Sequence, residues 1–375
     1  MNRRFEVLDS LRGLCAIAVV IFHVRLEGSI TEWSFFRGSY LFVELFFVLS
    51  GFVMAHGYAT RKPVGFSPFV TARFFRIFPL HIFMLAVFVL LELGKYLAHT
   101  KGIVTFNNPP FTGMGDPSQL IPNLLLVHAW TPFTSVGSFN YPSWSISIEF
   151  YTYLIFYVTL IIGGKRNWIT WLILSVSMLT LLESGNSVLE TKVMQGVSSF
   201  FTGSLTYLVY MKLKDLKIGK AVGTVIEISI LGLVILMVSG EISHSFTSLI
   251  ALFSLTVFIF SFESGYLSSF LKLNPFQIAG KLSYSIYLTH AAFLFCYTAL
   301  FMVLSKIIGA NLTVMIDDVR YVTTGSVIGN NLVLVAIIAF VLLQSVFSYK
   351  YIEVPFIQKG KKVTQPKTRK VTTSV

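Results

Sequence analysis

Long apolar segments separated by short polar connections run along almost the whole chain. A helix needs about 20 apolar residues to cross a hydrocarbon core of roughly 30 Å, and ten segments approach or reach that length. They lie at residues 8–27, 40–57, 77–98, 143–163, 168–184, 194–211, 221–239, 244–262, 282–305 and 328–348. Backbone groups in lipid must find their hydrogen bonds inside the protein, which favours helices. The pattern predicts an all-α fold, a polytopic transmembrane helical bundle of about ten spans without strands.

Basic residues mark every second connection between the predicted spans. Lys and Arg precede the first span and recur at residues 61–76, 165–166, 212–220 and 272–281. Cytoplasmic connections of membrane proteins are enriched in these residues. We therefore expect both termini in the cytoplasm and a multi-pass location in the inner (cytoplasmic) membrane. The long connection 99–142 then lies outside, where it can shape an entrance.

Composition agrees with a membrane domain. Of the 375 residues, 54% are hydrophobic and 12% are charged, which is more apolar than a soluble core requires. Part of the formal net charge of +12 follows the last apolar segment. We therefore expect residues 1–355 to form one transmembrane domain and residues 356–375 an unstructured basic cytoplasmic tail. Such a tail is typical of contact with anionic membrane lipids, and no nucleic-acid partner is expected.

Cysteine and histidine usage predicts neither a disulfide framework nor a metal site. The two cysteines, Cys15 and Cys296, both lie in apolar segments, and no His, Cys, Asp or Glu grouping has metal-ligand spacing. The first apolar segment contains Arg12 and lacks a small-residue cleavage signal. We therefore expect it to be a retained span and not a removed signal peptide.

Two ionisable residues inside the first span indicate chemistry. A charged residue costs roughly 2.5–3.5 kcal/mol to insert at the centre of a span, so it is a functional candidate by default. At 1.5 Å of rise per residue, Arg12 and His23 lie about 16 Å apart along one helix face. That face carries a cation near the inner boundary and an imidazole farther out. The alternative for Arg12 alone is a side chain that snorkels to the inner headgroups.

A carboxylate occupies the fourth span at a depth similar to that of His23. Glu149 lies two turns after Ser143, where that span enters from outside. We expect Glu149 to pair with His23, because a nearby carboxylate raises the basicity of imidazole and can fix its tautomer. The alternative is an interaction that only holds two helices together.

Further candidates flank the predicted spans. Arg73 and Arg76 lie one turn apart before the third span, and planar guanidinium groups suit the phosphates of coenzyme A. The alternative partners of these arginines are lipid phosphates. Ser50, in the second span, and Tyr284, in the ninth, are weaker candidates because hydroxyl side chains are also common where helices pack closely. His290, in the ninth span, lies some turns from the cytoplasmic end and is harder to explain by packing.

Together these residues resemble the acyltransferase-3 family of integral membrane O-acyltransferases. The resemblance covers nearly the whole chain. It is carried in order by residues 4–13 with Phe22 and His23, residues 43–52, residues 73–79, Trp144 and Ser145 with Glu149, residues 283–290, and residues 352–355.

The resemblance implies a reaction and a set of roles. It implies transfer of an acetyl group, or another acyl group, from cytoplasmic acetyl-CoA (acyl-CoA) to a hydroxyl of an extracytoplasmic glycan such as O-antigen, exopolysaccharide or peptidoglycan. Arg12 and His23 correspond to the family's essential pair, and Glu149 completes the catalytic set. The implied CoA-binding residues are Arg73, Arg76, Arg12, Ser50, Tyr284 and His290. With no esterase-like segment after the last span, we expect a stand-alone transferase.

Several alternatives stay open at this point. His23 can act as a general base on the acceptor hydroxyl or as a nucleophile that forms an acyl-imidazole. Ser147, Tyr284 and Ser285 are candidate donors to the developing oxyanion. The acyl group, the acceptor sugar, its position and its linkage to lipid are not determined by these patterns. A transporter that uses the same polar residues, or a non-catalytic scaffold, is the alternative function class.

Overall fold

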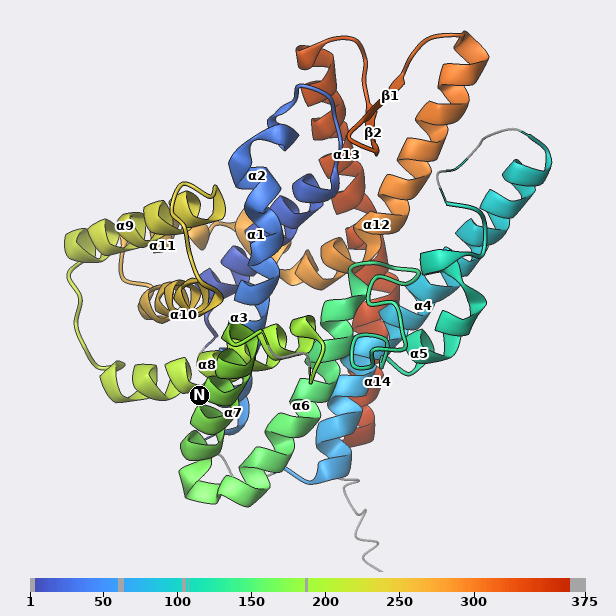
Figure 1. Cartoon of the computed structure of the whole chain (residues 1–375). Coiled ribbons are helices and arrows are strands. Elements are labelled where there is room, and N and C mark those ends of the chain that lie inside the picture. Colours follow the sequence, from blue (N-terminus) through green and yellow to red (C-terminus); the bar gives the residue numbers. More distant parts are fainter. Residues whose placement is uncertain (1–3, 60–63, 103–105, 107, 186–187, 365–375) are drawn as a thin grey trace, which may run out of the picture.

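The computed structural model describes residues 4–59, 64–102, 106, 108–185 and 188–364, and its regular structure is almost entirely helical (Figure 1). The helices are α1 (Glu6–His23), α2 (Ser34–Gly38), α3 (Phe42–Tyr58), α4 (Phe66–Thr100), α5 (Leu120–Leu124), α6 (Ser143–Gly163), α7 (Asn167–Glu183), α8 (Thr191–Leu213), α9 (Lys220–Val238), α10 (Phe246–Phe262), α11 (Tyr266–Leu271), α12 (Asn274–Ile308), α13 (Val327–Ser348) and α14 (Val354–Thr364). A π-helical turn, η6 (Tyr349–Glu353), joins α13 to α14. Short 3-10 turns occupy Ile30–Glu32, Ser39–Leu41, Gly113–Gly115, Pro117–Gln119 and Gly164–Arg166.

The prediction of a helical membrane protein is confirmed. Each predicted apolar segment overlaps one helix of 17 or more residues. Within the described residues, six helical stretches are long and apolar enough to cross a membrane, and α10 is a shorter apolar helix. The six are Ser34–Tyr58, Phe66–Thr100, Ser143–Glu183, Lys220–Val238, Asn274–Ile308 and Val327–Thr364. The count of ten spans and the cytoplasmic position of the termini stay predictions.

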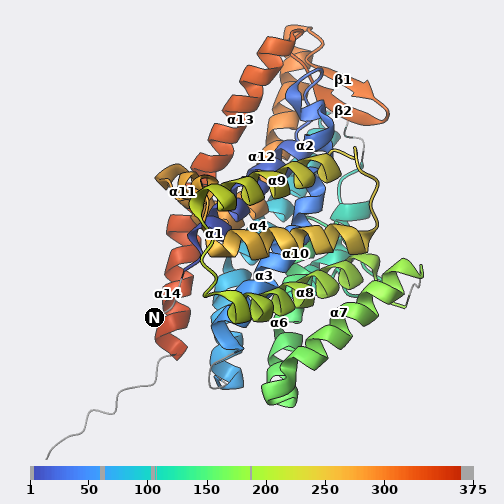
Figure 2. The ribbon, with the colours of Figure 1, turned by 90° about the vertical axis from the view of Figure 1, so that its left-hand side faces the viewer.

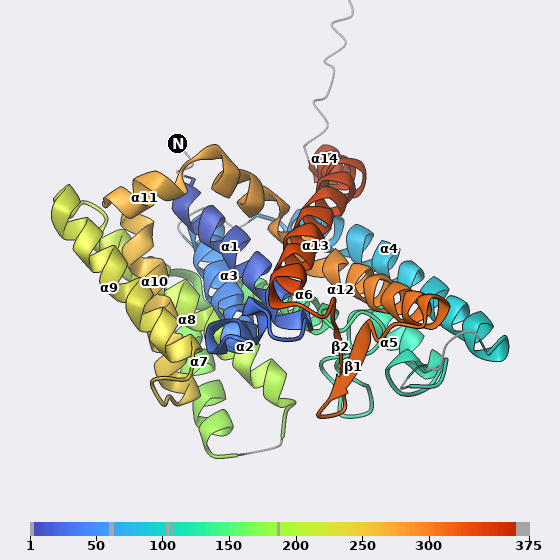
Figure 3. The same ribbon diagram turned by 90° about the horizontal axis from the view of Figure 1, so that it is seen from above.

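The helices surround a central pair, α1 and α3. Seen from above, α9, α10 and α11 lie on one side of this pair, and α4, α12 and α13 lie on the other (Figure 3). Helix α1 packs against α12 and α3, and α3 packs against α8, which in turn contacts α7 and α10. Helix α1, which carries Arg12, therefore meets α3, which carries Ser50, and α12 in the interior.

Two glycines allow α1 and α12 to touch backbone to backbone. A side-chain carbon at Gly13 would collide with the backbone of Ala279 and Gly280, and one at Gly280 would collide with the carbonyl of Asp9. Small residues at such positions let membrane helices approach closely enough for dispersion contacts and backbone hydrogen bonds. This contact fixes α1, which carries Arg12 and ends at His23, against α12.

A short β-hairpin corrects the expectation that the fold has no strands. Strands β1 (Thr313–Ile316) and β2 (Val319–Val322) pair antiparallel between α12 and α13. The two turn residues, Asp317 and Asp318, both have positive φ, at 47° and 59°, as a type I′ turn requires. The strands are too short to produce a clear alternating pattern. The chain after α1 extends the hairpin, because Leu26 pairs in parallel with Val322 (Figure 1).

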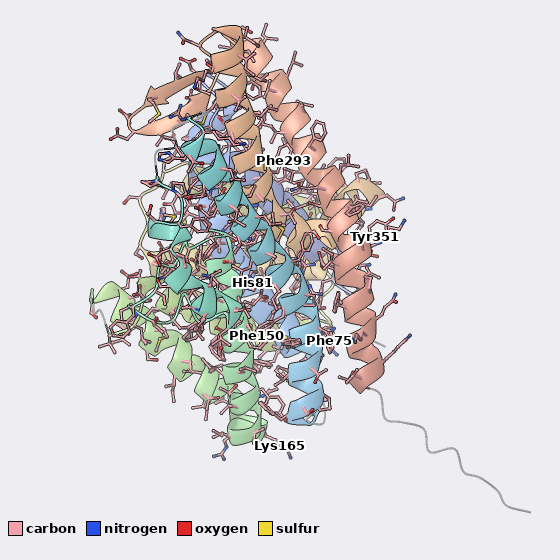
Figure 4. All side chains as sticks on the ribbon, turned by 90° about the vertical axis from the view of Figure 1, so that its right-hand side faces the viewer. Phe75, His81, Phe150, Lys165, Phe293 and Tyr351 are labelled. Carbon is pink, nitrogen blue, oxygen red and sulfur yellow. The ribbon has the colours of Figure 1, made fainter. Side chains whose placement is uncertain are left out.

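The end of the described chain is also more ordered than expected. Residues 356–364 belong to α14, which continues the line of α13 (Figure 2), so this part of the predicted tail is helical. Helix α14 packs along the part of α4 that carries Phe75 (Figure 4). The rings of Phe75 and Phe356 stack there, with centroids 6.4 Å apart. This contact with α4 gives the segment an apolar surface to fold against. The rest of the predicted tail, residues 365–375, lies outside the described residues.

The contact between α1 and α12 yields the first prediction. Gly280→Val places a branched side chain against the backbone of α1, so we expect a loss of stability of about 1–3 kcal/mol, as in overpacked cores. The measurement is thermal unfolding of the detergent-purified protein. Gly94→Val is the matched control, because nothing lies within 4 Å of the added carbon there. Equal melting temperatures for the two variants would contradict the proposed contact.

Candidate functional site

Two cavities lie near opposite ends of α1. The larger, about 450 Å³, lies near Arg12, and we call it the arginine cavity. Its polar lining residues are Arg4, Asp9, Arg12, Ser50, Arg73, Arg76, Ser145, Glu149, Tyr153, Lys281, Ser283, Tyr284, Tyr287, Tyr349 and Glu353. The smaller, about 230 Å³, is the histidine cavity. Its main lining residues are His23, Tyr40, Glu44, Tyr141, Trp144, Lys192, Gln195 and Tyr287. A third cavity of about 1010 Å³, beside α6 and α7, is lined by none of the predicted site residues.

Arg12 is held in place by the close approach of α1 and α12. Its Nε donates to the hydroxyl of Ser283 at 2.8 Å, and its Nη2 donates to the carbonyl of Gly280 at 3.2 Å. Nη2 also lies 3.4 Å from a carboxylate oxygen of Asp9. These bonds direct the guanidinium toward α12 and the arginine cavity. They do not support the alternative in which Arg12 only snorkels toward lipid.

The arginine pair on α4, Arg73 and Arg76, makes no direct ion pair within the described residues. The guanidinium of Arg73 lies 5.6–5.9 Å from the ring centroids of Tyr58, Phe69 and Tyr153, and its Nη2 donates to the hydroxyl of Tyr58 at 3.4 Å. Five basic side chains and three carboxylates line the cavity. The cavity is therefore suited to an anionic ligand.

Glu149 belongs to this cavity. Its Oε1 accepts a short hydrogen bond from the hydroxyl of Ser50 and a second, at 2.5 Å, from the hydroxyl of Tyr153. The hydroxyl oxygens of Ser50 and Tyr153 lie 3.1 Å apart. The carboxylate also interacts electrostatically with Arg12 and Arg76. Ser50, a predicted CoA-binding residue, is thus brought to the arginine cavity through Glu149.

A carboxylate from the end of the last span completes the arginine cavity. Glu353, in the π-turn η6, is buried and accepts a short hydrogen bond from Ser285, whose hydroxyl receives a bond of 2.9 Å from Ser348. Sequence reasoning included Glu353 in the family resemblance but assigned it no role. The available signal was an acidic residue directly after an apolar segment. A π-turn frequently marks a functional position in a helix.

Tyr284 lines the same cavity from α12. Its hydroxyl donates to the carbonyl of Ile77 at 2.7 Å, two residues before Pro79 in α4. The bond joins α12 to the segment of α4 that carries the arginines. His81, one turn farther along α4, is buried (Figure 4) and lies outside both cavities.

His23 lies in the other cavity, at the last residue of α1. Its ring centroid is 4.6 Å from that of Tyr141 and 5.2 Å from that of His290, with which it is stacked at 28°. His290 is fully buried, and its Nδ1 lies 3.2 Å from the carbonyl of Ile286. Its Nε2 has no hydrogen-bond partner within the described part of the chain. His290, predicted to bind CoA, is therefore placed beside His23 and not among the arginines.

The expected pair of His23 and Glu149 does not form. No hydrogen bond or ion pair joins the two among the described residues, and each lines a different cavity. The depth estimate placed Ser143 at the membrane boundary, but residues of the preceding loop cover the start of α6. Ser143 and Ser147 are fully buried, and Ser147 donates to the carbonyl of Leu126 at 2.5 Å. Glu149 consequently lies among the arginines.

The hydroxyls suggested as oxyanion donors are already engaged. Ser147 donates to Leu126, Tyr284 to Ile77, and Ser285 to Glu353. Each hydroxyl has a single hydrogen to donate. The structure therefore gives no support to an oxyanion role for these three residues.

Tyr287 separates the two cavities. Together with Val43 it lines both of them. Its hydroxyl accepts a hydrogen bond from Ser145 at 2.9 Å, and its ring packs edge-on against Phe46 with centroids 5.8 Å apart. The arginine cavity and the histidine cavity therefore meet at one buried aromatic side chain.

Comparisons with known proteins agree with these features. A sequence profile of the acyltransferase-3 family, described as "Acyltransferase domain", matches residues 5–350. "Acyltransferase MdmB" of Streptomyces mycarofaciens is 33% identical over 164 residues, which are 41% of this chain and 38% of that protein. "Protein 2 in picA locus" of Rhizobium radiobacter is 42% identical over 90 residues, 22% of this chain and 44% of that protein. The chain thus matches less than half the length of each relative. No solved structure is a significant match.

Proposed function

Because this chain belongs to the acyltransferase-3 family, we propose that it is a membrane O-acyltransferase. It moves an acetyl or other acyl group from cytoplasmic acyl-CoA to a hydroxyl of an extracytoplasmic glycan such as O-antigen or exopolysaccharide. The observation that carries this proposal is the pair of cavities at opposite ends of α1, one with an excess of basic over acidic side chains and one containing His23, which meet at Tyr287.

The arginine cavity is the proposed donor site. Arg73 and Arg76 present guanidinium groups that form no ion pair with the described residues, and such planar groups bind phosphate through paired hydrogen bonds. Coenzyme A carries a diphosphate and a 3′-phosphate, which supply matching charge. The volume of about 450 Å³ lies within the range of about 300–1,000 Å³ typical of small-molecule sites. Arg12, which is held against α12, contributes a further cation to this cavity from α1.

Glu149 and Glu353 have a supporting role in this proposal. Several cations of one sign around a cavity repel one another, and interspersed carboxylates reduce that cost. The hydrogen bonds from Ser50 and Tyr153 hold Glu149 in its position. Glu149 therefore acts on the donor side, and the orientation of His23 is left to Tyr141 and His290.

The histidine cavity is the proposed site of transfer. The pantetheine arm passes the Tyr287 wall and presents its thioester to His23. In the general-base route, the imidazole takes the proton of the acceptor hydroxyl as its oxygen attacks the thioester carbonyl. The carbon–sulfur bond breaks, and the proton then passes to the thiolate of CoA. In the nucleophilic route, the imidazole attacks the thioester carbonyl and the carbon–sulfur bond breaks, so that CoA leaves as its thiolate. The acceptor hydroxyl then attacks the acyl-imidazole, the imidazole is released, and the hydroxyl proton passes to the thiolate.

The expected absence of a metal site stays a prediction. Within the described residues, no group of three or more His, Cys, Asp or Glu side chains has an arrangement that could hold a metal ion. In both routes, atoms and charges balance with three reacting groups: the thioester, the acceptor hydroxyl and one imidazole.

Loss of an arginine from α4 should weaken CoA binding. For Arg76→Ala we expect the Kd for CoA to rise about 10- to 100-fold, since a hydrogen bond to a charged group contributes about 1.5–3 kcal/mol. Titration calorimetry on the purified protein measures this. Arg166→Ala, in the 3-10 turn before α7 and outside the arginine cavity, should bind CoA like the wild type. An unchanged Kd for Arg76→Ala would remove the donor assignment.

Loss of His23 should abolish transfer and spare CoA binding. The measurement is the acyl content of surface glycans, by mass spectrometry, in cells that carry His23→Ala or the wild type in place of a deleted gene. His99→Ala, at the exposed end of α4, is the matched control and should retain full acylation. Acylation that persists in His23→Ala, with the variant present in the membrane, would overturn the assignment of His23.

A further inference from the structure

The start of α8 brings two polar side chains into the histidine cavity that the transfer reaction does not use. Lys192 and Gln195 are three residues apart, so they share one helix face, and both line the cavity. Neither belongs to a segment that carries the family resemblance. Glu44 of α3 lines the same cavity opposite them.

These groups retain unused hydrogen-bonding capacity. The side-chain oxygen of Gln195 is buried and has no hydrogen-bond partner among the described residues. The ammonium of Lys192 lies 5.0 Å from the ring centroid of Trp144 and makes no ion pair within the described part of the chain. Buried polar groups in native proteins are normally satisfied, so each unpaired group calls for a ligand or another explanation.

The chemistry of the cavity selects among ligands. Lys192 supplies hydrogen-bond donors, and the side-chain oxygen of Gln195 is an acceptor. The carboxylate of Glu44 is also an acceptor, and one of its oxygens accepts a hydrogen bond of 3.1 Å from the hydroxyl of Ser199. A sugar hydroxyl both donates and accepts, so a ring with several hydroxyls matches this mixed set. Because Glu44 and Lys192 carry opposite charges, the set favours a ligand without net charge.

The size of the cavity limits the ligand further. Its volume of about 230 Å³ is below the range of about 300–1,000 Å³ typical of drug-sized ligands. One six-membered sugar ring is of suitable size, whereas a longer glycan must extend outward. Tyr40, which lines the cavity, is 49% exposed. The cavity is therefore accessible on this side, where further sugar units of a glycan can contact the protein.

We infer that the histidine cavity takes a single neutral sugar ring of the acceptor, and that Lys192 and Gln195 determine which ring is accepted. This inference rests on the proposed function, since the bound ring presents one hydroxyl to His23. The two side chains bind the other hydroxyls and thereby fix which one reaches the imidazole. They are specificity-determining residues and take no part in the proton transfer.

The test is binding of methyl glycosides to the full-length protein in detergent. Methyl glucoside, galactoside, mannoside and rhamnoside are titrated while tryptophan fluorescence is recorded, and Trp144→Phe shows whether the signal arises in this cavity. We expect at least one neutral glycoside to bind, and Gln195→Leu and Lys192→Met to raise its Kd at least 10-fold. Lys212→Met, near the other end of α8, is the matched control and should not change the Kd.

A parallel titration with CoA separates this inference from the proposed function. Unchanged CoA binding in Gln195→Leu and Lys192→Met shows that both variants are folded, and is expected here. If CoA binds the wild type but no neutral glycoside does, or if the two variants bind the glycoside like the wild type, the sugar site is refuted and the transferase proposal survives. Tighter binding of methyl glucuronide than of every neutral glycoside would refute the neutral ring. Failure of the wild type to bind CoA would instead refute the donor site.

Discussion

The contact between α1 and α12 is the constraint on which the site depends. Gly13 and Gly280 have no side chains that would separate the two helices, and dispersion attraction stabilises the close contact. Arg12 then reaches the carbonyl of Gly280 and the hydroxyl of Ser283. Farther along the same pair, His23 and His290 stack. One helix contact thus positions a cation in the first cavity and an imidazole in the second.

Electrostatics distinguishes the two ends of this helix pair. The arginine cavity concentrates positive charge, and two of its carboxylates, Glu149 and Glu353, accept hydrogen bonds from hydroxyls of α3, α6 and α12. In the histidine cavity, Lys192 and Glu44 are of opposite sign. An anionic donor and a neutral acceptor would each find the matching environment. Tyr287, on α12, stands between them and also packs near His290, with ring centroids 6.0 Å apart. In the proposed reaction, Tyr287 therefore separates the donor site from the site of transfer.

Much of the fold was predictable, because apolar length alone requires helices in lipid. Every predicted apolar segment overlaps a helix. The hairpin between α12 and α13 was missed because strands of four residues leave little periodic signal. Helix α14 was missed because its sequence is basic, and its order depends on a tertiary contact with Phe75.

The site was predictable only in part. Arg12 and His23 stood out because ionisable residues are rare in spans. The residues that contact Arg12 and His23 depend on the tilt of the helices, on which helices are neighbours and on the loops that cover helix ends. Counting residues along the sequence predicts none of these. Glu149 accordingly lies with Ser50 and Tyr153 instead of with His23. Lys192 and Gln195 had no signal at all, since they lie at the start of an ordinary apolar helix.

Transfer of the acyl group from one side of the membrane to the other is the central claim, and sealed membrane vesicles test it most directly. Inside-out vesicles from cells that contain the protein receive acetyl-CoA labelled in its acetyl group, and the glycans enclosed in the vesicles are then recovered. The account predicts label on enclosed glycan, protected from external glycosidase, and none in vesicles that carry His23→Ala. Label confined to glycan on the outer, CoA-exposed surface would contradict it.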